Sequence, residues 1–270
     1  MSHFAVAVIT EGYDTVEELL EPYMENCCGT PDRKYMEFYD VEEEYAKEYE
    51  NGTVSKVRCP DGSIASKWDK RFKVDERDEM GFMHERYEYP DGYEVVDIPC
   101  KEAYPTLGEY LEGWHGYSID EETGRYGYWQ NPNAKWDWYD DNGGRFRQYA
   151  IDLMGDQSLP IEDIKFDAAE HMARAEKWWQ KNMDEEGKPI GFAAFEWDGL
   201  DHDRYVKSRG HLSFRAVVTP DGEWHEVGEM GWWGCSTENA DETYEWRLHF
   251  EERFLEPYQD YWLTIVDCHI

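Results

Sequence analysis

The chain has 270 residues, with 61 acidic and 27 basic side chains, and its formal net charge is −34 at pH 7. Its aromatic fraction of 16% excludes a disordered acidic tail, because so many Trp, Tyr and Phe side chains are enough to form a core. The acidic charge excludes generic binding to duplex DNA or to a membrane surface, since both affinities depend on a basic face.

The first predicted elements are a strand and a short helix. Residues 3–9 form two alternating sets of side chains, which is the period-two pattern of a strand with two different faces. Thr15 and Glu18 have the spacing of a capping box, so we expect a helix over residues 15–21. Pro22 should end or kink this helix.

The middle of the chain changes from helical to β-rich. Residues 40–50 place apolar side chains four positions apart, which predicts a small amphipathic helix. Residues 53–99 contain short Val-, Ile- and Tyr-rich runs around Asp61-Gly62 and Asp91-Gly92, and such dipeptides favour β-hairpins. Residues 104–149 have little helical periodicity, so we expect irregular structure or short strands there.

The last third of the chain has clear periodic patterns. Residues 161–182 carry apolar side chains at spacings of three and four and predict a long helix. Residues 211–218 and 223–227 flank Pro-Asp-Gly and predict a hairpin. Residues 239–256 predict a second helix, and the β-branched run at 262–270 predicts a closing strand.

The two ends together predict the fold. Their elements follow the order strand, helix, strand, strand, helix, strand, which is that of a ferredoxin-like split βαβ unit in an α+β protein. Residues 1–30 plus 206–270 would form this core. Residues 31–205 would be a large β-rich insertion with the hairpins, a Trp-rich block and one long helix, or would be continuous with the core as one domain.

The Trp-rich block is the first candidate site. Its sequence NPNAKWDWY, followed by Gly143-Gly144-Arg145, places two cations beside aromatic rings in an acidic chain. A Gly-Gly pair also lets backbone amides approach an anion. The candidate ligand-binding residues are Asn131, Lys135, Trp136, Trp138, Tyr139 and Arg145. Alternatively the Trp side chains belong to the core, the cations pair with carboxylates, and the glycines form a turn.

The terminal strands supply the second candidate site. In the predicted fold these strands are antiparallel neighbours, so His3 approaches His269. Asp267 shares a face with His269, whereas Cys268 points to the opposite face. His3, Asp267 and His269 are therefore candidate catalytic residues for proton transfer or metal binding. The alternative is a pair of surface histidines near frayed ends.

Common signatures are missing from the sequence. It contains no GxGxxG, GxxxxGK, HExxH or GxSxG motif, so no cofactor and no metal site are expected. The opening MSHFAVAVIT has no basic region, and no eighteen apolar residues are consecutive, which predicts a protein that is neither secreted nor membrane-spanning. Six cysteines without a CxxC pair are typical of reduced thiols in a cytosol.

Several segments resemble a known group of proteins. The MSHF start, the NPNAKWDWY…GGR block and the VDCHI end are similar to an uncharacterised family of hypothetical proteins of tailed phages and prophages. The resemblance implies a viral accessory protein that acts in the host cytoplasm, and it brings no activity with it.

Three functions follow from these patterns. The first is counter-defence by binding, in which an aromatic and cationic pocket captures a nucleotide-like immune signal or the protein captures a host defence protein. The second is an acidic DNA mimic that inhibits a host nuclease or restriction factor, although the charge is also consistent with solubility or adaptation to salt. The third is a small hydrolase or metal-dependent enzyme that uses His3, Asp267 and His269.

Overall fold

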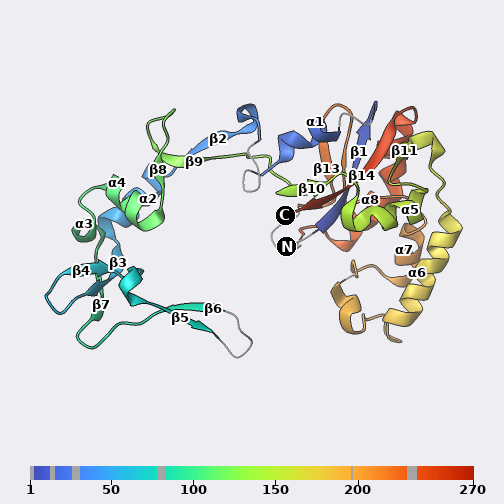
Figure 1. The fold of residues 1–270 in the computed structure, drawn as a ribbon. Helices are drawn as coiled ribbons and strands as arrows, with labels where there is room; N and C mark the ends of the chain where they lie inside the picture. The colour runs from blue at the N-terminus through green and yellow to red at the C-terminus, as the bar shows by residue number, and fades with distance from the viewer. Residues whose placement is uncertain (1–2, 13–15, 26–30, 78–82, 196, 230–235) are drawn as a thin grey trace. The chain divides into compact units, whose positions relative to one another are not determined.

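The fold is described from a computed structural model of the chain. The structure describes residues 3–12, 16–25, 31–77, 83–195, 197–229 and 236–270. The chain forms two compact units (Figure 1). Unit 1 comprises residues 1–36 and 131–270, and unit 2 comprises residues 37–130.

Unit 1 is built on a six-stranded sheet (Figure 1). Its strands are, in spatial order, β10 (Trp138–Asp140), β14 (Trp262–His269), β1 (His3–Thr10), β12 (Ala216–Val218) and β13 (Trp224–Glu226), and β11 (Ser158–Pro160) also pairs with β14. The β1–β12 pair is parallel and the others are antiparallel. Both terminal strands therefore lie in the middle of one sheet.

The predicted pairing of the terminal strands is confirmed. Their antiparallel register runs from His3 opposite His269 to Thr10 opposite Trp262. The α+β class is also confirmed, but the ferredoxin-like split order is not. In a split βαβ unit another strand separates the two parallel strands. Here β12 pairs directly with β1, and the half-buried β13 lies outside it.

The two faces of the sheet are covered by different helices. Ala5, Ala7 and Ile9 point to the α5/α8 face, which is covered by α5 (Arg147–Met154), α8 (Ala240–Phe250) and the following π-turn η10 (Glu251–Leu255). The even-numbered β1 residues point to the α1 face, where α1 (Val16–Leu20) and Trp136 cover them. The alternation follows from the period of two along a strand, and it places His3 on the α5/α8 face.

Two further helices, α6 (Ala168–Asn182) and α7 (His202–Ser208), pack on each other through aromatic rings. The predicted helix over 161–182 begins late, because the Asp167 side chain accepts a hydrogen bond from the Glu170 amide and caps it. Short helical turns complete unit 1: η2 (Glu21–Tyr23), η3 (Arg33–Tyr35), η6 (Gly144–Phe146), η7 (Ile161–Asp163), η8 (Gly191–Phe195) and η11 (Glu256–Tyr258). Thr15 of the predicted capping box lies outside the described residues.

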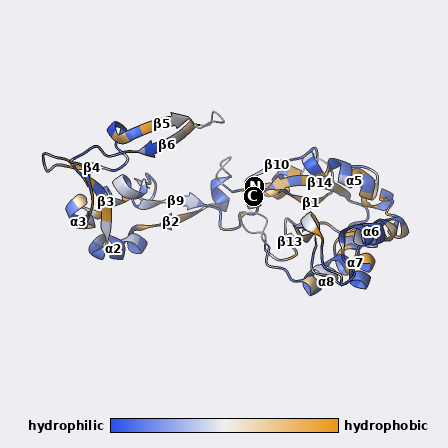
Figure 2. Cartoon of the chain, turned by 90° about the horizontal axis from the view of Figure 1, so that it is seen from below, coloured by the Kyte–Doolittle hydropathy of each residue, from blue (hydrophilic) through white to orange (hydrophobic). Residues whose placement is uncertain are grey.

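Unit 2 contains three small sheets. One has β2 (Glu37–Asp40), β9 (Tyr126–Gln130) and β8 (Ser118–Ile119), the next has β4 (Ile64–Ser66), β3 (Thr53–Arg58) and β7 (Glu94–Pro99), and β5 (Lys73–Arg77) pairs with β6 (Met83–Tyr87). Its helices and turns are α2 (Glu42–Asn51), α3 (Cys100–Ala103), α4 (Leu107–Tyr110), η4 (Lys70–Phe72) and η5 (Leu111–His115). Figure 2 shows α2 in the hydrophilic colour over most of its length.

Of the two hairpin turns predicted in unit 2, one is confirmed and the other is wrong. The turn at Asp61-Gly62 joins β3 to β4 as expected. The turn at Asp91-Gly92 does not join a hairpin, because β7 pairs with β3 rather than with β6. This pairing carries Ile98 into a cluster with Val54 and Tyr49, and the burial of these side chains decides the partner.

The boundary between the units differs from the predicted insertion of residues 31–205. Residues 131–205 belong with unit 1, because β10 and β11 both pair with β14 and α5 packs on the same sheet. Among the described helices, none combines the length and the apolar composition needed to cross a membrane.

Candidate functional site

The terminal strands bring His3 and Asp267 together. The His3 Nδ1 lies 2.9 Å from the Asp267 Oδ1, and both side chains point to the α5/α8 face at one end of the sheet. The Asp267 side chain is only 2% exposed and that of His3 12%. A buried carboxylate needs a charged or hydrogen-bonding partner. An Nδ1–H that donates to Asp267 leaves the Nε2 of His3 as the basic nitrogen.

The Gly143-Gly144-Arg145 turn completes the partners of Asp267. The Arg145 backbone N–H donates to Asp267 Oδ2 at 2.8 Å. Gly144 has a φ of +40°, and a Cβ at this position would lie 2.8 Å from the Asp267 Cβ. Glycine is therefore required both for the left-handed backbone and for the close approach. The Gly-Gly pair brings an amide to an anion, as its sequence suggested, but the anion is the protein's own carboxylate.

The WDWY block joins the same group of residues. Trp138 lies opposite His269 in the β10–β14 register and stacks on its ring, with centroids 5.0 Å apart and planes at 15°. The His269 Nδ1 is 2.5 Å from the Asp137 Oδ1, and the two histidine rings are 5.0 Å apart. We call His3, Asp137, Trp138, Asp267 and His269 the histidine cluster. It consists of two histidine–carboxylate pairs on adjacent strands.

The histidine cluster is suited to proton transfer. Each carboxylate holds one imidazole in a fixed orientation, and a histidine held in this way is the usual general base of enzymes. Cys268 between them points to the α1 face, where burial raises the pKa of its thiol well above the usual range. The described residues contain no group of three or more His, Cys, Asp and Glu side chains placed to hold a metal ion.

The six predicted ligand-binding residues do not gather around one cavity. Trp136 is buried in the α1-face core and donates its indole N–H to the Leu20 carbonyl. Asn131 is buried and donates to the carbonyls of Pro22 and Met24. Both are structural, because large aromatic rings and satisfied buried amides stabilise a fold without a ligand.

The cations and the remaining ring of the predicted pocket are also separated. The Lys135 ammonium pairs with Glu226 at 2.7 Å. Tyr139 packs with Trp136 against the α1 face. Arg145 is exposed and contributes its backbone amide. The predicted aromatic and cationic wall therefore does not form. Trp138 belongs to the histidine cluster, Arg145 contacts it only through its backbone amide, and Lys135 is held in an ion pair.

A large cavity in unit 1 adjoins the histidine cluster. Its volume is about 990 Å³, and His3 forms part of its wall. Four arginines, Arg174, Arg209, Arg215 and Arg247, line it, whereas Asp198 and Glu238 are its only acidic lining residues within the described part of the chain. A wall with more cations than anions is exceptional in a chain with a net charge of −34. A concave, locally basic surface is what an anionic ligand requires.

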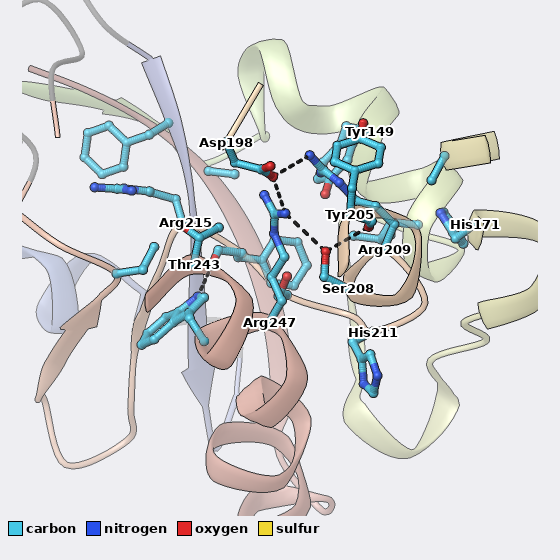
Figure 3. A pocket seen from close by; sticks show the side chains of 18 of the residues that line it. Tyr149, His171, Asp198, Tyr205, Ser208, Arg209, His211, Arg215, Thr243 and Arg247 are labelled. Carbon is cyan, nitrogen blue, oxygen red and sulfur yellow. Dashed lines mark hydrogen bonds and ion pairs between the residues drawn. The ribbon is translucent and has the colours of Figure 1, made fainter. Parts of the chain in front are cut away.

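Two of these arginines share one carboxylate. Figure 3 shows Asp198 between Arg209 and Arg247, at 3.4 Å from the Nη2 of Arg209 and 2.5 Å from the Nη1 of Arg247. Arg247 lies on α8, and it also reaches the Ser208 hydroxyl at the end of α7. Burial and the neighbouring Arg209 lower the pKa of Arg247. One carboxylate for two cations leaves room for a further anion.

Arg215 has unused donors. Its Nη1 pairs with Glu238, and this hydrogen bond lowers the pKa of Glu238 although burial opposes the shift. The Nε and Nη2 of Arg215 and the Nε of Arg209 are buried and have no hydrogen-bond partner among the described residues. A buried donor without a partner costs about 1–3 kcal/mol, so the residues around these two guanidinium groups do not satisfy them fully.

Aromatic rings line the same cavity. Trp178 stacks on Tyr205, with centroids 5.1 Å apart, and Trp246 and Tyr149 also line the wall. The Tyr149 ring is exposed, whereas its hydroxyl is surrounded by protein, which raises its pKa. Flat rings beside guanidinium groups suit a ligand with its own aromatic ring. Sequence analysis did not single out these residues as a site, because they lie on separate segments of the chain that meet only in the folded protein.

Comparison with known protein families, with curated proteins and with solved structures finds no match to this chain. The chemistry of the site therefore rests on its own geometry.

Replacing Gly144 with Ala is expected to disrupt the histidine cluster without removing any of its functional groups. The added Cβ would contact Asp267 and the residue would have to keep a positive φ, so the loop must shift and the Arg145 amide must leave Asp267. We expect a loss of about 1–3 kcal/mol in the free energy of unfolding. Urea unfolding would measure it, with Gly222→Ala as control, because that glycine also has a positive φ but no atom near the added Cβ.

Proposed function

We propose that the protein binds a small anionic ligand with an aromatic ring, such as a nucleotide, in the arginine-lined cavity of unit 1. The observation that carries the proposal is the set of buried, unpartnered guanidinium nitrogens of Arg215 and Arg209 at a cavity in a strongly acidic chain. Guanidinium groups bind phosphate and carboxylate through paired hydrogen bonds. The ligand's anionic group occupies the side of the cavity that Arg209 and Arg215 line.

The size and lining of the cavity support this class of ligand. A volume of about 990 Å³ is at the upper end of the range found for small-molecule sites. The Trp178–Tyr205 stack and Trp246 offer surfaces for a base, and Ser208 and Thr243 offer hydroxyl groups. Base stacking and phosphate contacts contribute about 1–3 kcal/mol each, which is enough together for micromolar binding.

The biological role that we propose is counter-defence in a bacterial host. In the viral setting that the sequence resemblance implies, the protein would act in the host cytoplasm and sequester a nucleotide signal of the host's immune response. Capture of a host defence protein remains a second form of the same role. The alternative of an acidic DNA mimic rests on the net charge alone, whereas ligand capture has a defined cavity with matching chemistry.

Ligand-induced stabilisation tests this function. The purified chain would be heated with mononucleotides, linear dinucleotides and cyclic dinucleotides, because a ligand that binds only the folded state raises the midpoint of unfolding. We expect at least one phosphate-bearing ligand to stabilise the protein. Replacing Arg215 with Ala should weaken its binding about 10- to 100-fold, since a charge-assisted hydrogen bond contributes about 1.5–3 kcal/mol.

Arg145→Ala is the matched control, because Arg145 is exposed and does not line the cavity. It should bind the ligand with unchanged affinity. The function would be contradicted if no anionic ligand stabilised the wild-type chain, or if Arg145→Ala and Arg215→Ala weakened binding equally.

A further inference from the structure

We propose that the His3–Asp267 pair is a general base that catalyses hydrolysis of a phosphoester bond in the ligand bound by the cavity. This inference rests on the proposed function for its ligand and goes beyond it, because it adds a reaction to binding. His3 connects the histidine cluster to the cavity, because it is a member of the cluster and also lines the cavity.

The free nitrogen of His3 is the reactive atom. Its Nδ1 is occupied by Asp267, and no hydrogen bond joins its Nε2 to another described residue. The Asp267 carboxylate is itself fixed on its other oxygen by the Arg145 amide. An imidazole that is oriented by a buried carboxylate and lines a cavity has the arrangement that a general base requires. Asp267 is therefore a positioning residue, and His3 is the group that acts on water.

The sheet places Arg215 next to His3. Ala216 pairs with Val6 in the parallel β1–β12 register, so Arg215 lies beside Ala5, two residues from His3 on the same face. A rise of about 3.3 Å per residue and a strand spacing of about 4.8 Å put the Cα atoms of His3 and Arg215 roughly 8 Å apart. Both residues line the cavity, so a phosphate bound beside Arg215 lies within reach of a water molecule held by His3.

The reaction balances with water as the only co-reactant. The water oxygen attacks the phosphorus atom, and its proton passes to the Nε2 of His3. The bond from phosphorus to the ester oxygen breaks, and the proton then passes from the imidazolium to this leaving oxygen. The products are an alcohol and a phosphate with one ester bond fewer, and His3 returns to its neutral form. Arg215 stabilises the negative charge that develops on the phosphoryl oxygens.

His269 helps to hold the His3 ring in position. His269 is buried, its Nδ1 is used by Asp137, and Trp138 covers its ring. It packs against His3 with planes at 76°, which restricts the orientation of the His3 ring. His269 does not line the cavity, so its role is to position His3 rather than to contact the ligand.

Hydrolysis of two chromogenic probes tests the proposal. Bis(4-nitrophenyl) phosphate reports on phosphodiesters and 4-nitrophenyl phosphate on phosphomonoesters, and both release a coloured nitrophenolate. We expect the full chain to hydrolyse at least one of them. His3→Ala should lower kcat by about 100-fold or more with little change in KM, because general-base catalysis typically contributes 10²- to 10⁴-fold. Added imidazole should restore part of the rate of this variant, which no structural role of His3 would produce.

Two further variants separate the reaction from binding and from folding. Asp267→Asn keeps the shape of the side chain and should lower kcat while ligand binding persists. Arg147→Ala is the control, since Arg147 is exposed and does not line the cavity; it should keep the wild-type rate. Circular dichroism establishes that each variant is folded.

Each outcome has a distinct meaning. Nucleotide binding without hydrolysis of either probe overturns this inference and leaves the proposed function intact. Hydrolysis that persists in His3→Ala, or a loss of rate that imidazole does not restore in a folded His3→Ala chain, also overturns it. Absence of both nucleotide binding and hydrolysis overturns the inference and the proposed function together.

Discussion

Replacing Asp198 with Ala is expected to lower the free energy of unfolding by about 3–5 kcal/mol, because it leaves the partly buried side chains of Arg209 and Arg247 without their shared carboxylate. The Asp198 side chain is only 11% exposed, so water replaces little of the lost interaction. Arg209 and Arg247 would then repel each other, since burial and the nearby Arg209 already lower the pKa of Arg247. Urea unfolding monitored by Trp fluorescence would measure the change.

Asp203→Ala provides the control for Asp198. Its side chain is 97% exposed, and its ion pair with His202 lies at the surface, so the expected change is within about 0.5 kcal/mol. The variant Asp198→Ala also gives a second result: phosphate in the buffer should restore part of the lost stability by occupying the vacated position between the two arginines. Equal stability of the Asp198→Ala and wild-type chains would show that the arginines do not depend on this carboxylate.

Replacing Phe250 with Ala is expected to lower the free energy of unfolding by about 3–5 kcal/mol. The side chain is fully buried at the centre of the α5/α8 face, and its ring contacts those of Phe214, Trp246 and Phe254. The deletion removes apolar contacts and opens a void in a close-packed core. The same unfolding measurement applies to it.

Phe192→Ala is the matched control, because its side chain is 87% exposed and is the same size. We expect a change of less than about 0.5 kcal/mol. A loss below 1 kcal/mol for Phe250→Ala would mean that the core between the sheet and α8 closes around the deletion.

The sequence allowed the terminal strands and their chemistry to be predicted. The alternation in residues 3–9 and the β-branched run at 262–270 identify two strands, and a register that matches their faces brings His3 to His269 and Asp267. The sequence did not indicate whether β12 or β13 would lie beside β1. Helix and strand patterns are local, whereas the choice of neighbour depends on which strand is fully buried, and that is a property of the packed sheet.

The Trp-rich block shows a different limit. Its predicted ligand-binding residues do not share a cavity, and the pattern could not say that the Gly-Gly pair approaches Asp267, or that Trp138 stacks on His269. Those contacts join segments more than 120 residues apart, as the Arg145–Asp267 separation of 122 shows. The cavity was missed for the same reason. Arg209 follows α7, Arg215 precedes β12 and Arg247 lies on α8. In the sequence each resembles an ordinary surface cation.

The central position of both terminal strands has a consequence for how the protein is made. β1 leaves the ribosome long before its partner β14, since the paired residues His3 and His269 are 266 positions apart. Until then, an apolar strand with two unpaired edges is exposed to other chains. Pairing at such a separation slows folding, because the cost of closing the loop precedes the gain from contacts. The histidine cluster therefore assembles only when translation has passed His269, and chains that stop earlier carry β1 without its neighbour.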